Sequence, residues 1–204
     1  MKERASYERE VAYAILDEAL LCHIGFSVDG STTVLPTTYA RVDDSLYVHG
    51  ALANHMLGVL ANDTPACVSV TLLDALVLAR ASFHHSMNYR SVVIFTKGTK
   101  VEDPTEKLAA LNAIVEHVVP GRTSDARPPS EAELRASLVI RLPIEEFSAK
   151  VRVGPPIDDA EDLNLPIWAG IVPLQMIAGV GITDPILIPG VCAPSYATHY
   201  PPRA

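Results

Sequence analysis

The sequence predicts an antiparallel β-barrel with a few peripheral helices, a mainly β or α+β domain. Three observations lead to this fold class. Strand-like apolar segments recur between turn signals, each is joined to the next by a hairpin or a local excursion, and no strand–GxGxxG–helix unit is present. The 204 residues, 49% hydrophobic and 20% charged, suffice for one domain with a substantial core.

The first half of the chain predicts a helix, a meander of three strands and a second helix. The expected elements are a helix over 7–18, strands over 20–28, 33–42 and 45–50, and a short helix over 53–63. Ser6 can cap the first helix and Asn54 the second. Pro36 interrupts the middle strand, which places it at a sheet edge or at a bulge.

The second half predicts a longer hairpin, a well-capped helix and two closing strands. The expected elements are strands over 66–79 and 89–102, a helix over 103–118, a short helix over 131–135 and two strand segments within 137–153. Asp74 is unusual inside an apolar strand, which indicates a bulge or a paired carboxylate. Asp103, Pro104 and Glu106 have the pattern of a capping box. The apolar stripe expected on that helix is Leu108, Leu111, Val115 and Val118.

The domain plan is therefore a barrel domain over 1–153 and a Pro- and Gly-rich extension over 154–204 that packs on the same domain. A net charge of −8 argues against a nucleic-acid surface. The positive mean hydropathy fits a chain that buries more surface by dimerising. Three scattered cysteines and a charged N-terminus without an apolar core predict a cytoplasmic protein with reduced thiols and no signal peptide.

A first candidate binding site follows the third strand, in the segment YVHGALANHM at 47–56. The strand ends at His49 and Gly50, and a helix begins near Asn54. The free N–H groups of a helix N-terminus suit a phosphate, and His55 offers a further hydrogen bond. A plain capped helix after a turn is the alternative.

A second candidate is the segment SFHHSMNYRSVVIF at 82–95, which is rich in polar side chains. His84 and His85 are adjacent, so on a strand they would point to opposite faces and chelate a metal poorly. Ser86 lacks the GxSxG turn of a hydrolase nucleophile. Recognition of an anion or a ring remains, with Arg90 able to fork onto a phosphate or carboxylate and Tyr89 and Ser91 supplying neutral donors. A surface salt bridge of Arg90 is the alternative.

Two further segments are suited to a planar ligand. In LPTTYAR at 35–41, an edge strand with free backbone groups lets Thr37, Thr38 and Tyr39 line a ring. Trp168, the only tryptophan, can stack on an aromatic ligand or simply anchor the C-terminal segment to the core.

These segments in this order resemble the flavin-binding proteins of the pyridoxamine 5′-phosphate oxidase-like superfamily, closest to the nitroimidazole-resistance branch. The resemblance covers about residues 5–175. It implies a split β-barrel, a homodimer, and FMN bound in clefts at the dimer interface, with a flavin-dependent oxidoreductase activity whose substrate the sequence does not name. It also implies where each predicted site residue would lie.

By position, the resemblance places Pro36, Thr37, Thr38 and Tyr39 along the flavin ring, and His49, Gly50 and Ala51 at the turn beside it. It places Asn54 and His55 at the phosphate. Tyr89, Arg90 and Ser91 would form a wall from the neighbouring strand, across the dimer, and Trp168 would lie over the cleft. His49 would be a proton donor or a substrate contact. True pyridoxamine phosphate oxidases have Ser-Arg-Lys at Ala53–His55, so that specific activity is not expected. Two alternatives stay open: a flavin carrier or sensor without turnover, and a haem or metal site at His49, His84 or His85.

Overall fold

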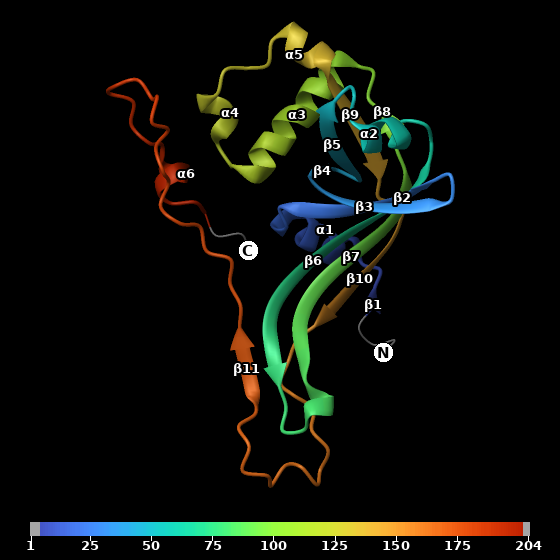
Figure 1. The fold of residues 1–204 in the computed structure, drawn as a ribbon, viewed down its shortest axis with the longest axis vertical. Helices are drawn as coiled ribbons and strands as arrows, with labels where there is room; N and C mark the ends of the chain where they lie inside the picture. Colours follow the sequence, from blue (N-terminus) through green and yellow to red (C-terminus); the bar gives the residue numbers. More distant parts are fainter. Residues whose placement is uncertain (1–4, 202–204) are drawn as a thin grey trace.

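The computed structural model describes residues 5–201 as two antiparallel sheets with helices around them (Figure 1). The strands are β1 (Ala5–Ser6), β2 (Leu21–Val28), β3 (Ser31–Thr38), β4 (Ala40–Val42), β5 (Ser45–Ala51), β6 (Pro65–Leu78), β7 (Ser86–Lys97), β8 (Thr99–Lys100), β9 (Ser137–Pro143), β10 (Glu146–Arg152) and β11 (Gly170–Pro173). The helices are α1 (Arg9–Glu18), α2 (His55–Leu60), α3 (Pro104–Val118), α4 (Arg122–Asp125), α5 (Glu131–Ala136), α6 (Ser195–Thr198) and the 3₁₀ turn η2 (Ser82–His84).

The larger sheet has the strand order β1-β10-β7-β6-β2-β3, with β11 added to β6, and the smaller sheet has the order β4-β5-β9-β8. The two sheets are not closed into one ring, so the fold is a split barrel, which confirms the predicted fold class. The main core lies between them and under α1 and α2. It includes Leu16, Ile24, Val48, Leu57 and Ile140, all fully buried or nearly so.

The N-terminal elements follow the sequence prediction with two differences. Helix α1 begins at Arg9 after Glu8, and no side chain caps it; the Ser6 hydroxyl instead accepts from the Glu8 N–H. Strand β3 runs straight through Pro36, and the chain breaks into a new strand only at Tyr39. Pro36 is tolerated because β3 is the last strand of its sheet, as predicted for a proline on an edge.

Strands β6 and β7 form a long hairpin that extends well beyond the barrel and ends at η2 (Figure 1). Strand β7 begins at Ser86, three residues earlier than predicted. The register of the pair shifts between Leu73 and Ala75, so Asp74 sits at a bulge, and its carboxylate pairs with Arg90. Both structural explanations offered by the sequence for Asp74 are therefore correct.

Helix α3 begins as predicted, but its buried face is different. The Asp103 carboxylate accepts from the N–H groups of Thr105 and Glu106. Glu106 does not reach back to complete a capping box, because its carboxylate accepts from Tyr47. The buried residues of α3 are Ala110 and Ile114. The predicted stripe was wrong in part: Leu111 packs against this cluster, but the buried contacts to β4 and β5 are made by Ala110 and Ile114.

After β10 the chain runs past the hairpin tip, returns as β11 along β6, and continues as an extended segment to α6 (Figure 1). Strand β11 and α6 both contact the barrel domain, whereas residues 175–192 are exposed. None of the described helices has the length and apolarity needed to cross a lipid bilayer.

Candidate functional site

The edge strand β3 and the start of α2 form the first candidate site. One side of β3 has no strand partner among the described residues, so a row of its backbone N–H and C=O groups is free for a ligand. The His55 ring lies 6.4 Å from the ring of Phe26, which pairs with Thr33 of β3. His55 therefore lies next to β2, the strand that pairs with β3.

The turn between β5 and α2 is tightly built. The Asn54 side chain accepts from the Leu57 N–H, as predicted for a helix cap. A Cβ atom added to Gly50 would lie 3.0 Å from Leu57 and 3.3 Å from Asn54, so this strand end passes close to the helix. Gly50, Asn54 and His55 are thus held together at this turn, while Pro36, Thr37 and Thr38 lie on β3, which contacts β5.

Tyr39 belongs to the core. Its side chain is fully buried, its hydroxyl donates to the Leu16 carbonyl at 2.6 Å, and its ring lies 5.1 Å from His117. The chain turns from β3 to β4 at this residue, which carries its side chain inward. In this structure the phenol is therefore a packing group, and it does not face the exposed edge of β3.

Arg90 is held by two carboxylates. Its guanidinium donates to Glu18 of α1, with one contact at 2.8 Å, and to Asp74 at 2.8 and 3.0 Å. These hydrogen bonds raise the pKa of Arg90 above its ordinary value. The ion pair considered as the alternative to phosphate binding is thus present, and it is a network joining α1 to the β6 bulge.

Tyr89, Ser91 and Trp168 lie away from the β3 group. Tyr89 and Ser91 pair with Leu73 and Thr71 of β6 and alternate with Arg90, so they point to the opposite face of the sheet. Trp168 is 65% exposed, and its ring covers the backbone of Gly170. It is not the core anchor that its size suggested.

The histidine pair sits at the hairpin tip, where His84 ends the 3₁₀ turn η2 and His85 follows it, so neither residue is in a strand. His84 contacts the Asp159 carboxylate at 3.1 Å, and His85 contacts the Ala81 carbonyl at 3.1 Å. No group of three or more potential metal ligands was found within residues 5–201.

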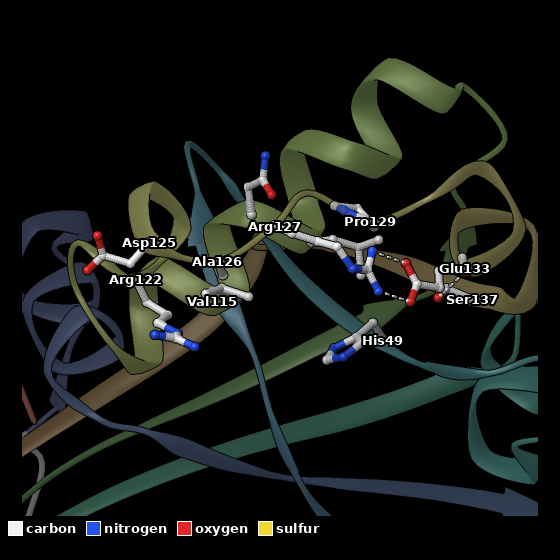
Figure 2. A pocket seen from close by; sticks show the side chains of 11 residues that line it. His49, Val115, Arg122, Asp125, Ala126, Arg127, Pro129, Glu133 and Ser137 are labelled. Carbon is white, nitrogen blue, oxygen red and sulfur yellow. Dashed lines mark hydrogen bonds and ion pairs between the residues drawn. The ribbon is translucent and has the colours of Figure 1, made fainter. Parts of the chain in front are cut away.

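His49 faces a separate cavity of about 610 Å³ under α3, α4 and α5 (Figure 2). The Nδ1 atom of His49 is buried and has no hydrogen-bond partner among residues 5–201. Burial lowers the pKa of this imidazole, which favours the neutral form. Because β5 is a strand, His49 points away from the barrel core that Val48 and Gly50 face.

Apolar and charged groups share the cavity wall. Its lining residues are His49, Leu111, Asn112, Val115, Arg122, Asp125, Ala126, Arg127, Pro129, Glu133 and Ser137. Arg127 is paired with Glu133 at 2.6 Å and lowers the pKa of that carboxyl to about 2, together with the Ser130 N–H. Arg122 donates to the Tyr196 hydroxyl at 2.9 Å.

The sequence did not indicate this cavity. The sequence predicts Leu111 and Val115 on the apolar stripe of a helix, and it predicts no helix or strand for the segment with Arg122 and Arg127. One sequence signal could have indicated this cavity. The helix over 103–118 has more apolar residues than a single packing face can bury, and two arginines follow it. Likewise, Asp74 and Glu18 gave no sign of a common partner, because they are 56 residues apart in sequence.

A family model described as pyridoxamine 5′-phosphate oxidase matches residues 8–151. The chain belongs to this family. The match covers the barrel from α1 to β10, which is the part of the family fold that contains β3, α2 and His49. None of the curated proteins compared matches the chain.

Two solved structures of this family type are similar over nearly the whole chain. The flavocytochrome Anf3 from Azotobacter vinelandii is 35% identical, with a TM-score of 0.89, over 96% of this chain and 91% of that one. An FAD and haem binding protein from Mycobacterium smegmatis is 35% identical, with a TM-score of 0.90, over 94% of each chain. A nitroimidazole antibiotic resistance protein from Bacteroides thetaiotaomicron shares the fold, at 24% identity and a TM-score of 0.61, over 72% of this chain and 86% of that one.

Proposed function

We propose that this chain is a flavin-binding homodimer with a redox function. The observation that carries the proposal is its 35% identity, over nearly full length, to two solved proteins named for a flavin. The sequence analysis predicts FMN, and the Mycobacterium smegmatis relative is named for FAD. Both nucleotides have the same isoalloxazine ring, so the site on β3 serves either one.

The residues of the first candidate site fit a flavin. The free backbone groups of β3 around Pro36 and Thr37 can hydrogen-bond the polar edge of a planar heterocycle. Gly50 lets the end of β5 pass close to α2, which holds the turn in place, and His55 at the start of α2 adds a hydrogen-bonding group. Asn54 already satisfies the Leu57 N–H, so its role is to fix the turn.

The flavin would supply the redox chemistry, by transferring a hydride or electrons at its N5 atom. The chain would bind and orient it and would exclude water from its ring. We propose that Tyr89, Ser91 and Trp168 reach the flavin from the partner subunit, because they lie far from β3 in the same protomer. A carrier or sensor would have the same site without turnover, and stopped-flow reduction by NADH or NADPH separates the two.

The size of the exposed surface supports a second copy. The chain exposes 12886 Å², whereas a compact monomer of 21.9 kDa exposes about 9,300 Å². The excess, about 3,600 Å² per chain, is larger than the roughly 1,000–2,500 Å² that each partner buries in an obligate homodimer, so there is ample surface for such an interface.

The test is flavin titration of cofactor-free protein. We expect His55→Ala to weaken binding about tenfold, or roughly 1.4 kcal/mol, because the variant loses a contact beside the ring. His84→Ala, on the distant hairpin tip, is the matched control and should bind as the wild type does. Equal affinity in all three proteins would place the flavin elsewhere, and no binding of FMN or FAD by the wild type would reject the proposal.

A haem is the second candidate ligand, and the His49 cavity supports it. An unpartnered, neutral, buried imidazole is the form that ligates iron, and Leu111, Val115, Ala126 and Pro129 provide apolar walls. Arg122 could pair with a propionate. Both relatives at 35% identity carry a haem or cytochrome in their names.

Hemin titration tests this second function. The wild type should give a shifted Soret band, and His49→Leu should lose it while His85→Ala keeps it. A band that survives in His49→Leu would remove His49 as the ligand.

A further inference from the structure

Residues 174–193 form a segment, here called the strap, that is fixed to the protomer at both ends. At its start, β11 pairs with β6, and the Leu174 N–H donates to the Asp74 carbonyl at 2.9 Å. Beyond its end, the Tyr196 hydroxyl donates to Asp125 at 2.9 Å, and the Tyr200 hydroxyl donates to the Val118 carbonyl at 2.5 Å. The strap is therefore a bridge between two anchors rather than a loose tail.

The middle of the strap is apolar and exposed. Its large exposed apolar side chains are Met176, Ile177, Val180, Ile182, Ile186, Leu187, Ile188 and Val191. Ile177 is 82% and Ile182 is 97% exposed. The only charged residue of the strap is Asp184, and its carboxylate accepts from the Ile186 N–H within a turn. Contiguous apolar surface of this kind on a soluble protein indicates an interaction site.

The strap runs beside the barrel without packing on it. Figure 1 shows it as an extended trace between β11 and α6, to the left of the sheets. Gly181 lies against Ala197, so the strap contacts α6, while its large apolar side chains stay exposed. Because the two anchors hold it in place, covering these side chains requires another surface.

We propose that the strap is a docking surface for a second copy of this chain, which packs against its apolar side chains in the dimer. This inference rests on the homodimer proposed above. The exposed apolar side chains of the strap account for part of the excess surface that a second copy would cover. A lipid surface fits less well, because residues 154–201 contain no Lys or Arg and the whole chain carries a charge of −8.

Photo-crosslinking tests which chain the strap touches. With the photoreactive amino acid benzoylphenylalanine in place of Ile182, irradiation should give a covalent dimer at twice the mass of the chain. The same amino acid in place of Glu131, whose side chain is 90% exposed on α5, is the control and should give little dimer. Crosslinks that stay within one chain at position 182 would overturn the proposal.

A charge placed in the strap gives an independent measurement. The double variant Ile177→Asp with Ile182→Asp should weaken self-association at least 100-fold in sedimentation velocity, with unchanged secondary structure, because both side chains are exposed in the protomer. Gln175→Asp puts the same charge on a polar position of the strap and should weaken it far less. The proposal would be contradicted if the double variant remained as dimeric as the wild type. It would also be contradicted if the wild-type protein did not self-associate and instead co-sedimented with vesicles of neutral and anionic phospholipid.

Flavin content, measured in the same samples, separates this inference from the proposed function. A wild-type dimer that contains flavin but gives only crosslinks within one chain would reject the strap and leave the function standing. A colourless wild-type monomer that takes up no flavin would reject both.

Discussion

Single residues in this protein show how a functional prediction and a structural role compete for the same side chain. Arg90 was predicted to bind a phosphate because an arginine beside polar residues is suited to it. The structure gives it two carboxylate partners, Glu18 and Asp74, with its own side chain only 28% exposed. A network of this kind leaves little of the guanidinium for an anion.

We therefore predict that Arg90→Ala mainly lowers stability. Removal of the cation leaves two partly buried carboxylates facing each other, which should cost about 2 kcal/mol of unfolding free energy. Urea denaturation of the cofactor-free protein measures this cost. Arg135→Ala, which breaks an exposed pair with Glu131 on α5, is the matched control and should cost less than about 0.5 kcal/mol. An Arg90→Ala protein with wild-type stability and lost flavin affinity would restore the phosphate role.

His49 predicts a pH dependence of stability. Its pKa is lowered in the folded protein by burial, so below about pH 6.5 the unfolded chain binds a proton at this residue before the folded chain does. Its contribution is fully present above that pH and is lost as the pH falls below it. The stability of the cofactor-free wild type should drop relative to His49→Gln between pH 8 and pH 5.5. Parallel profiles for the two proteins would show that His49 is not buried as a neutral group.

The elements were predictable where local chemistry sets them. Asp103 and Pro104 fix the start of α3, and Asn54 fixes the start of α2. The position of Pro36 on an edge strand also follows from the missing N–H of proline. What the sequence could not provide is which face of α3 packs, because that depends on where β4 and β5 lie. The His49 cavity is a consequence of this choice, since Leu111 and Val115 face it.

Glycines at two element positions give a prediction with an internal control. A Cβ atom at Gly98, between β7 and β8, would lie 2.5 Å from the Leu60 carbonyl and 2.8 Å from Ile140. Gly98→Ala should therefore cost about 2 kcal/mol of unfolding free energy by overpacking. A Cβ atom at Gly58 in α2 meets nothing within 4 Å, so Gly58→Ala should raise stability by up to about 1 kcal/mol. Equal effects of the two changes would mean that the backbone at Gly98 does not lie against Leu60 at the end of α2.

At the scale of the whole molecule, the split barrel and its family were predictable from the order of the elements. The predicted site residues are spread over several places. Some lie on β3 and at the turn before α2, Tyr39 lies in the core, His49 faces its own cavity, and Tyr89 to Ser91 lie on the long hairpin. The sequence does not show that one protomer keeps them apart. The pattern of residues along one chain predicts which strands are neighbours in a sheet far better than it predicts contacts between two copies of the chain. The strap was not foreseen for the same reason, since its apolar residues resemble a core until their exposure is known.

The central claim is that the chain binds a flavin, and the purified protein tests it most directly. Its visible spectrum should show the two absorption bands of an oxidised flavin, and mass spectrometry of the cofactor released by heat should identify FMN or FAD. A colourless protein that releases neither nucleotide, and that stays colourless after incubation with micromolar FMN and FAD, would contradict the account.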